Sequence, residues 1–173
     1  YDQVGLARRG QLHQRIGLRL EAGYGARAGE IAAQLAVHFE RSGATAQAVH
    51  YAQQAADNAA RRNAHYEAST ALRKGLALLA TLAESPERSQ HELALLLTLG
   101  ELLRTTQGVG APDVGDAYTR AYTLAQQVGE TRQRGQALQG LSRFHLVQAQ
   151  LRLAGELCQQ YCDLASEKHD QTL

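Results

Sequence analysis

Large and small apolar residues recur along the chain in an order that repeats on successive helical segments. One pair of segments carries the pattern at Ala32, Leu35, Ala36, Phe39, Ala48, Ala52 and Ala55. A second pair repeats it at Leu138, Leu141, Ser142, His145, Ala154, Cys158 and Tyr161. Small residues on one helix let its partner approach closely, and hairpins that also stack on their neighbours form solenoids. The pattern therefore predicts a row of antiparallel helix hairpins.

The same periodicity divides the chain into about eight helices. β-Branched residues are sparse, and no stretch alternates polar and apolar residues for long enough to predict a strand, so the expected class is all-α. The expected helices span residues 5–22, 30–41, 45–62, 65–83, 86–106, 113–128, 131–147 and 151–168. Short connections place consecutive helices side by side and antiparallel. The expected fold is a right-handed α-solenoid of antiparallel helix hairpins.

Glycine, proline and small polar residues predict where several helices end and begin. Gly43 suits the left-handed position after a helix, and Thr45 is the expected N-cap of the next one. Ser85 and Pro86 predict a capped start with proline in the first turn. Glycines inside helices cost about 1 kcal/mol relative to alanine and therefore predict close approach of neighbouring helices. These glycines are Gly17, Gly75, Gly100, Gly140 and Gly155.

The pairing of helices decides which residues face a partner. We prefer pairs formed by helices one and two, three and four, five and six, and seven and eight, although a shift by one helix would exchange the concave and convex faces. In the preferred pairing the concave face carries His50, Gln53, Asp57, Leu97, Glu101, Arg104, Gln136, Gln139 and Arg143. Long polar side chains on rigid helices suit hydrogen bonding to an extended peptide or to another helix. The alternative is that these residues simply face solvent.

Charge and cysteine content narrow the class of function. The 173-residue chain has a formal net charge of +1. Acidic and basic residues are interspersed, which disfavours nucleic acid as a partner. Its apolar runs are too short to span a bilayer, and its first residues show no signal-peptide pattern. Its two cysteines fit a reducing compartment, so we expect a cytoplasmic location. Because the chain begins without methionine, we expect it to be a segment of a longer polypeptide.

Candidate chemistry is weak throughout the sequence. Cys158 and Cys162 lie one helical turn apart and could share a metal ion with His145 or His169, but small apolar packing positions are the favoured interpretation. His91 and Glu92 do not continue into a zinc-binding HExxH motif. No nucleophile motif is present either. We therefore expect no cofactor, no metal site and no enzymatic activity.

Two segments resemble the tetratricopeptide-type region of large bacterial signalling ATPases. Residues Ala48–Leu79 read AVHYAQQAADNAARRNAHYEASTALRKGLALL, and residues Pro86–Leu124 begin PERSQHELALLLTLGELL. The distance from Ala117 to Ala154 is close to the about 34 residues of a tetratricopeptide unit. Such proteins join an ATPase module to helical repeats, often with a nucleotide cyclase, a protein kinase or a DNA-binding domain. This chain has no GxxxxGK[ST] phosphate-binding loop.

The resemblance implies a division of the chain and a role. Residues 1–27 are interpreted as an N-terminal helix, with the end of an upstream ATPase module as one interpretation, and residues 28–173 as tetratricopeptide-like repeats. The preferred hypothesis is a non-catalytic scaffold for protein–protein or interdomain interaction within a larger bacterial signalling protein. Its partner would be a protein, a peptide or other domains of the same parent chain, and self-association is left open. The alternative is a sensor domain that binds a small effector and regulates an attached ATPase or output domain.

Overall fold

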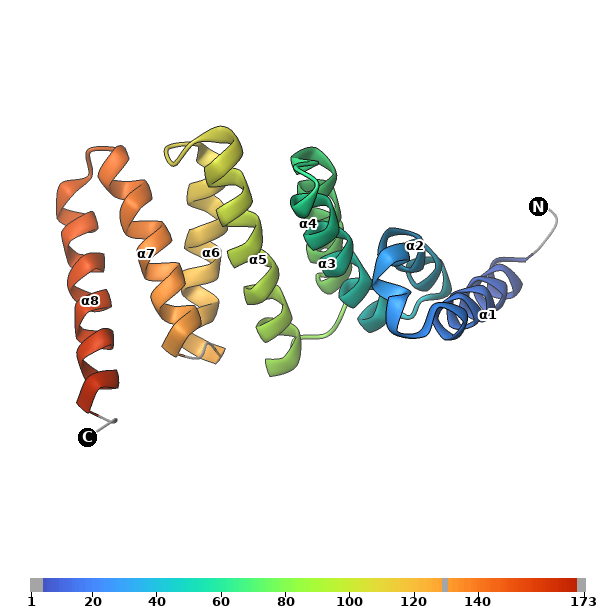
Figure 1. Cartoon of the computed structure of the whole chain (residues 1–173). Coiled ribbons are helices and arrows are strands. Elements are labelled where there is room, and N and C mark those ends of the chain that lie inside the picture. Colours follow the sequence, from blue (N-terminus) through green and yellow to red (C-terminus); the bar gives the residue numbers. More distant parts are fainter. Residues whose placement is uncertain (1–4, 129–130, 171–173) are drawn as a thin grey trace. The chain divides into compact units, whose positions relative to one another are not determined.

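The computed structural model describes residues 5–128 and 131–170, which form helices and contain no strand. The chain divides into two compact units, residues 1–82 and 83–173. Unit 1 contains α1 (Leu6–Tyr24), the 3₁₀ helix η1 (Gly25–Ile31), α2 (Ala32–Ser42), α3 (Thr45–Arg61) and α4 (His65–Leu79). Unit 2 contains α5 (Pro86–Gln107), α6 (Pro112–Val128), α7 (Thr131–Val147) and α8 (Leu151–Asp170) (Figure 1). The all-α class is confirmed for these residues.

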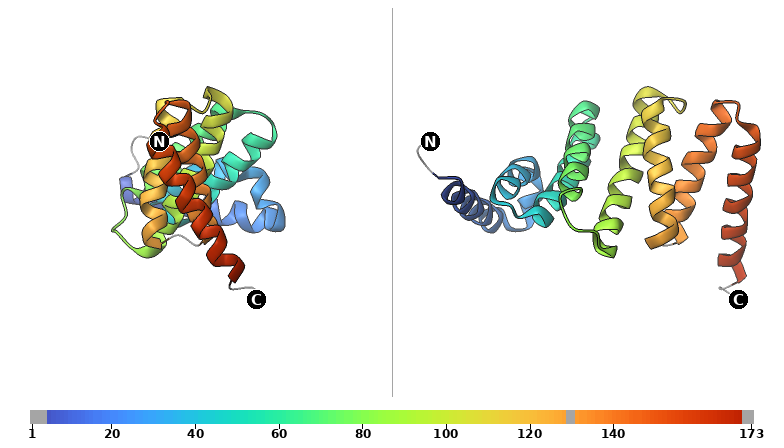
Figure 2. Two further views of the ribbon diagram at one scale, coloured as in Figure 1. Left: turned by 90° about the vertical axis from the view of Figure 1, so that its left-hand side faces the viewer. Right: turned by 180° about the vertical axis from the view of Figure 1, so that it is seen from behind.

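Within each unit, consecutive helices pack as neighbouring antiparallel pairs (Figure 2). In unit 2, α5 also contacts α7, so a helix packs against both the next helix and the one after it. Among the described residues, no helix combines the length and the apolar character that crossing a bilayer requires.

Local capping accounts for several helix boundaries. The Ser85 hydroxyl accepts a hydrogen bond from the Arg88 backbone N–H at 3.1 Å, and Pro86 occupies the first turn of α5, as the sequence predicts. Gly43 follows α2 in the left-handed conformation with φ of 80°. The expected Thr45 cap is wrong: Ala44 holds the N-cap position of α3, and no side chain caps it.

Several helix limits differ from the sequence prediction by one to four residues, and local turns account for two of these differences. The helix expected from residue 30 begins at Ala32, because the 3₁₀ helix η1 occupies the preceding seven residues. This 3₁₀ helix begins at Gly25, whose φ is 51°. The helix expected to reach residue 83 ends at Leu79. There the chain tightens into turns, with the Thr81 N–H bonded to the Leu78 carbonyl at 3.1 Å. Such bonds to the third preceding residue commonly satisfy the groups at a helix end.

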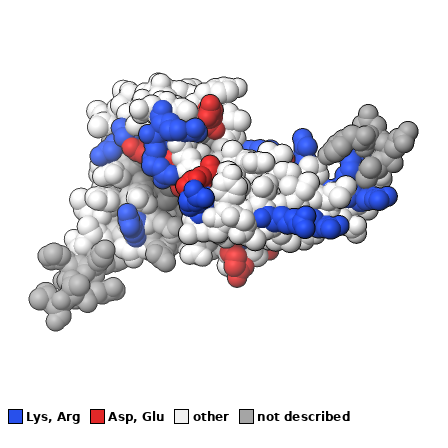
Figure 3. Space-filling view, turned by 45° about the vertical axis from the view of Figure 1, so that its right-hand side comes forward, with Lys and Arg blue, Asp and Glu red and all other residues white. Residues whose placement is uncertain are grey.

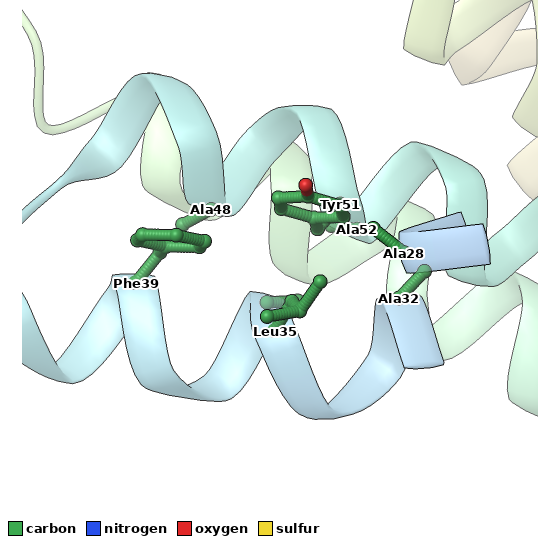
Figure 4. Close-up of a cluster of buried hydrophobic side chains, with 8 residues drawn as sticks. Ala28, Ala32, Leu35, Phe39, Ala48, Tyr51 and Ala52 are labelled. Atoms are coloured by element: carbon green, nitrogen blue, oxygen red, sulfur yellow. The ribbon is translucent and has the colours of Figure 1, made fainter. Parts of the chain in front are cut away.

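The core of unit 1 joins large side chains of α2 to small ones of α3. Figure 4 shows the Phe39 ring against Ala48. That ring also stacks on Tyr51, with centroids 5.6 Å apart and planes inclined by 8°. Leu35 and Ala32 are fully buried beside them. The alternation of large and small residues therefore produces the close helix contact that the sequence predicts.

A histidine pair links α1 to α2 in the same unit. The Nδ1 atoms of His13 and His38 lie 3.0 Å apart, so one ring donates a proton that the other accepts. Burial lowers the pKa of His38, and the neighbouring His13 and Arg41 lower it further. The pair therefore favours the form in which at most one of the two rings is charged.

In unit 2, the Tyr118 ring of α6 lies between two glycines. A Cβ atom on Gly140 of α7 would stand 2.2 Å from the ring, and one on Gly100 of α5 would stand 3.0 Å from it. A Cβ on Gly115 would likewise collide with Phe144 at 2.4 Å. Gly100 and Gly140 therefore provide the space that lets three helices meet around the Tyr118 ring.

The expectation of close approach is confirmed at some of the helical glycines and wrong at another. On α1, a Cβ on Gly17 would meet the Phe39 ring at 3.2 Å. Gly155 of α8 is different, because no atom lies within 4 Å of the position that a Cβ would occupy. This face of α8 is exposed.

Candidate functional site

Three of the residues expected on the concave face, Glu101, Arg104 and Arg143, gather around Tyr118 in unit 2. The Arg104 guanidinium donates two hydrogen bonds to the Glu101 carboxylate, from Nε at 2.9 Å and from a terminal nitrogen at 2.5 Å. The Tyr118 hydroxyl donates to the same carboxylate at 3.4 Å. Arg143 approaches from α7 and acts on Glu101 through its charge. We call these four residues the Glu101 cluster.

The electrostatics of the Glu101 cluster keep its carboxylate charged. The hydrogen bonds from Arg104 lower the pKa of Glu101, and the charges of Arg104 and Arg143 act in the same direction. Burial raises the pKa of Tyr118 to about 12, and the nearby Glu101 carboxylate adds to this effect. Tyr118 therefore remains a neutral donor, and Arg104 is already engaged by Glu101. Arg143 is exposed, and among the described residues it forms no direct ion pair, so it is the cation of the cluster that a ligand can use.

Arg143 also ends a stripe of exposed polar side chains along α7. The stripe consists of Arg132, Gln136, Gln139 and Arg143, whose spacing of four, three and four residues places them on one helix face. Gln136, Gln139 and Arg143 were expected from the sequence, and Arg132 was not. The same helical spacing, continued one turn toward the N-terminus, would have found it. We call these residues the α7 stripe.

All residues of the α7 stripe except Arg143 border a hollow between α7 and α8. The hollow has a volume of about 240 Å³. Gly135, Tyr161 and Leu164 are among the residues that line it, and Arg132, Gln136 and Gln139 contribute polar groups. Leu164 is buried, whereas Tyr161 is 40% exposed. Sequence reasoning did not identify this hollow, because it depends on how closely two helices pack at a glycine.

The remaining expected residue of α5, Leu97, lies one turn before Glu101 and is half-buried. It therefore contributes to packing as well as to the surface.

The three expected residues of α3 belong to unit 1 and have different surroundings. His50 is exposed, and its ring meets Tyr51 edge-on with centroids 5.0 Å apart. Gln53 is half-buried. Asp57 lines a cleft of about 710 Å³ between α3 and the segment that contains η1 and the start of α2.

Hydrogen bonds organise one wall of this cleft. The Asn58 side chain donates to the Gly29 carbonyl at 2.6 Å and accepts a hydrogen bond from Arg61. Arg62 donates to the Asn58 carbonyl at 3.2 Å. Arg27, Arg61 and Arg62 face the same cleft as Glu30 and Asp57, so its lining carries both signs of charge.

The cysteines do not occupy the buried positions expected for them. Cys158 and Cys162 are both exposed, because α8 packs mainly on α7 and these two residues lie on its open side. His145 instead bonds to Gln150 at 2.6 Å, and the side chain of His169 lies outside the described part of the structure. No group of metal-ligating side chains assembles among the residues that are described.

Comparisons with known proteins add no relative: no protein-family model matches the chain, and no curated protein matches it significantly.

On the face drawn in Figure 3, basic and acidic side chains lie in small groups among uncharged ones.

Proposed function

We propose that the chain is a non-catalytic helical-repeat scaffold that binds a protein or peptide through the exposed polar side chains of α5 and α7. In this proposal the hairpins form a right-handed, tetratricopeptide-like solenoid, and the scaffold serves a larger bacterial signalling protein in the cytoplasm. The partner is a separate protein or another domain of the parent chain. Binding uses shape and polar complementarity and involves no covalent step.

The observation that carries this proposal is the contact between α5 and α7, which brings the Glu101 cluster and the α7 stripe onto adjoining helices. Surface ion pairs contribute about 0–1 kcal/mol to stability, so the pairing of Glu101 with Arg104 has little value for the fold alone. It does hold Arg104 in place and leaves Arg143 available. Side chains positioned on packed helices also lose less conformational freedom when a ligand binds.

The test uses the full chain as bait for a phage-displayed library of short random peptides. Selected peptides are then synthesised with a fluorescent label, and their affinities are measured by fluorescence polarisation. We expect Arg143→Ala to weaken binding by about tenfold, as for loss of one charged contact, and Arg104→Ala to weaken it less. Arg19→Ala, at an exposed position of α1, is the matched control. Equal affinities for all three variants and the parent chain would contradict the assignment of this surface.

A second candidate function is recognition of a small effector in the cleft of unit 1. The observation that favours it is the volume of about 710 Å³, which lies within the range of ligand pockets, together with the mixed charges of its walls. A ligand that binds only the folded chain must raise its melting temperature. Thermal-shift screening against metabolites therefore tests this function, and Arg27→Ala should reduce any shift that a charged metabolite produces. If no metabolite raises the melting temperature, or if Arg27→Ala leaves every such increase unchanged, the cleft is not an effector site.

A further inference from the structure

We infer that the hollow between α7 and α8 receives an apolar side chain from an acidic peptide segment, whose carboxylates pair with Arg132 and Arg143. This inference rests on the proposed function and specifies the chemistry of the partner. It depends on three features of unit 2: the lining of the hollow, the charge of α7 and the length of the α7 stripe.

The lining of the hollow suits an apolar group surrounded by polar atoms. Gly135 is buried and has no side chain, so the space above its backbone stays open between the helices. A Cβ on Gly135 would lie 3.4 Å from the Tyr161 ring and 3.9 Å from Leu164. An apolar side chain placed there would contact both of these groups, and burial of its surface would favour binding. Ligand sites commonly combine such an apolar floor with a few polar groups that fix orientation.

The charge of α7 favours an acidic ligand. This helix contains Arg132, Arg134 and Arg143 and no aspartate or glutamate. Within the described residues, no hydrogen bond or ion pair engages the Arg132 guanidinium. Glu101, the carboxylate nearest to Arg143 in the cluster, is already bound by Arg104. The two arginines at the ends of the α7 stripe are therefore available to carboxylates of a partner, and such complementarity both steers and selects a ligand.

The length of the α7 stripe fits a short extended segment. Arg132 and Arg143 are eleven residues apart, which corresponds to about 16 Å at the helical rise of 1.5 Å per residue. An extended peptide covers this distance with about five residues. Gln136 and Gln139 lie between the arginines, and their amides can both donate to and accept from a peptide backbone. The expected ligand is a segment of about five residues with acidic residues near its ends and an apolar residue beside the one that meets Arg132.

Peptide selection on the full chain tests the inference. The probe is the phage library of short random peptides, followed by fluorescein-labelled synthetic copies of the enriched sequences. We expect enrichment of an apolar residue flanked by acidic residues. Replacing the apolar residue by alanine, or the acidic residues by their amides, should weaken binding by about tenfold or more.

Two matched glycine variants separate binding from folding. Gly135→Ala places a methyl group in the hollow at an ordinary contact distance from Tyr161, so the chain should fold while peptide affinity falls about fivefold or more. Gly155→Ala makes a similar change on α8 where nothing lies within 4 Å, and affinity should stay unchanged. Arg132→Glu should abolish selection of acidic peptides, and circular dichroism melting of all three variants checks that the helices persist.

The outcomes distinguish this inference from the proposed function. If enriched peptides lose affinity with Arg143→Ala but lack the acidic and apolar residues, or tolerate Gly135→Ala and Arg132→Glu, then the scaffold binds peptides and the inference about the hollow is wrong. If no peptide is enriched over the bare support, the proposed function fails together with it. If peptide affinity depends on Gly135, Arg132 and the peptide carboxylates, the result supports both the proposed function and the inference about the hollow.

Discussion

At the scale of single residues, the sequence is most constrained where two groups lie so close that an added proton or methyl group would be unfavourable. His13 and His38 share one hydrogen bond between Nδ1 atoms 3.0 Å apart, which leaves no favourable arrangement for two protonated rings. Tyr118 lies where a methyl group on Gly140 would overlap its ring. Both cases lead to predictions about stability. The folded chain disfavours a second protonated ring or a methyl group at position 140, whereas the unfolded chain accommodates either.

The histidine pair predicts that the chain loses stability on mild acidification. Burial, His13 and Arg41 lower the pKa of His38 in the folded chain below its usual value of 6.5. As the pH falls below about 6.5, the unfolded chain takes up a proton that the folded chain resists. The free energy of unfolding should therefore decrease from pH 7.5 to pH 5.5, as measured by urea unfolding followed by circular dichroism.

A pair of glutamine variants assigns this pH dependence to the half-buried His38 ring. His38→Gln should reduce the dependence, since glutamine does not titrate, whereas His50→Gln at an exposed position of α3 should keep it. An unchanged slope in His38→Gln would show that other groups are responsible.

The glycines of unit 2 predict opposite effects of the same substitution. Gly140→Ala forces a methyl group into the Tyr118 ring and should lower the free energy of unfolding by about 1–3 kcal/mol, as overpacking does. Gly155→Ala meets no atom within 4 Å and should raise it by about 1 kcal/mol through helix propensity. Thermal unfolding of both variants tests the contrast, and a stabilising Gly140→Ala would contradict the described packing of α6 against α7.

At the scale of elements, the turns between helices use left-handed residues that differ in how well they suit that conformation. Gly43 and Asn63 are residues that tolerate a positive φ, and they follow α2 and α3. The turn between α7 and α8 instead places Ala149 at a φ of 57°. It is held by a bond from the Gln150 N–H to the His145 carbonyl at 2.9 Å. Alanine pays a steric cost there that glycine would avoid.

Ala149→Gly should therefore stabilise the chain. Relief of the left-handed strain exceeds the entropy that glycine loses on folding, and we expect a gain of up to about 1 kcal/mol in the free energy of unfolding. Ala80→Gly is the matched control, because Ala80 has an ordinary helical φ of −62° and should lose about 0.5–1 kcal/mol. Urea unfolding measures both, and a loss in both variants would reject strain at Ala149.

The elements also show which parts of the fold the sequence can predict. The start of α5 at Ser85 and Pro86 and the end of α2 at Gly43 agree with the sequence prediction. In both cases the residues that predict the helix limit are the same ones that form it. The 3₁₀ helix η1 was not predicted: its sequence contains Gly25 and Gly29, and residues 23–29 were expected only to connect two helices. In the structure this segment packs on α1, α2 and α3, and the sequence alone does not show that packing. The exposure of Cys158 could not be predicted either, because it depends on which helix covers α8.

At the scale of the whole molecule, the chain consists of two units that each close a core of their own. In unit 1 the core joins Leu35, Phe39 and Tyr51 to small residues, and in unit 2 it surrounds Tyr118. The candidate site divides in the same way, because three expected residues belong to α3 and six to α5 and α7. The sequence placed Glu101, Arg104 and Arg143 on the expected concave face through the preferred pairing of the helices. It could not predict that Arg104 would be engaged by Glu101, which depends on side-chain conformation.

Separate cores predict that damage to one unit stays within it. Leu35 is fully buried in unit 1, and Leu35→Ala should lower the stability of that unit by about 2–5 kcal/mol by removing apolar contacts and leaving a cavity. Hydrogen exchange followed by mass spectrometry should then show faster exchange of backbone amides in residues 5–82, while α5, α6 and α7 keep their protection.

Leu93→Ala, at a fully buried position of α5, is the reciprocal variant and should leave α2 and α3 protected. Faster exchange throughout the chain in either variant would mean that the two cores unfold as one cooperative unit.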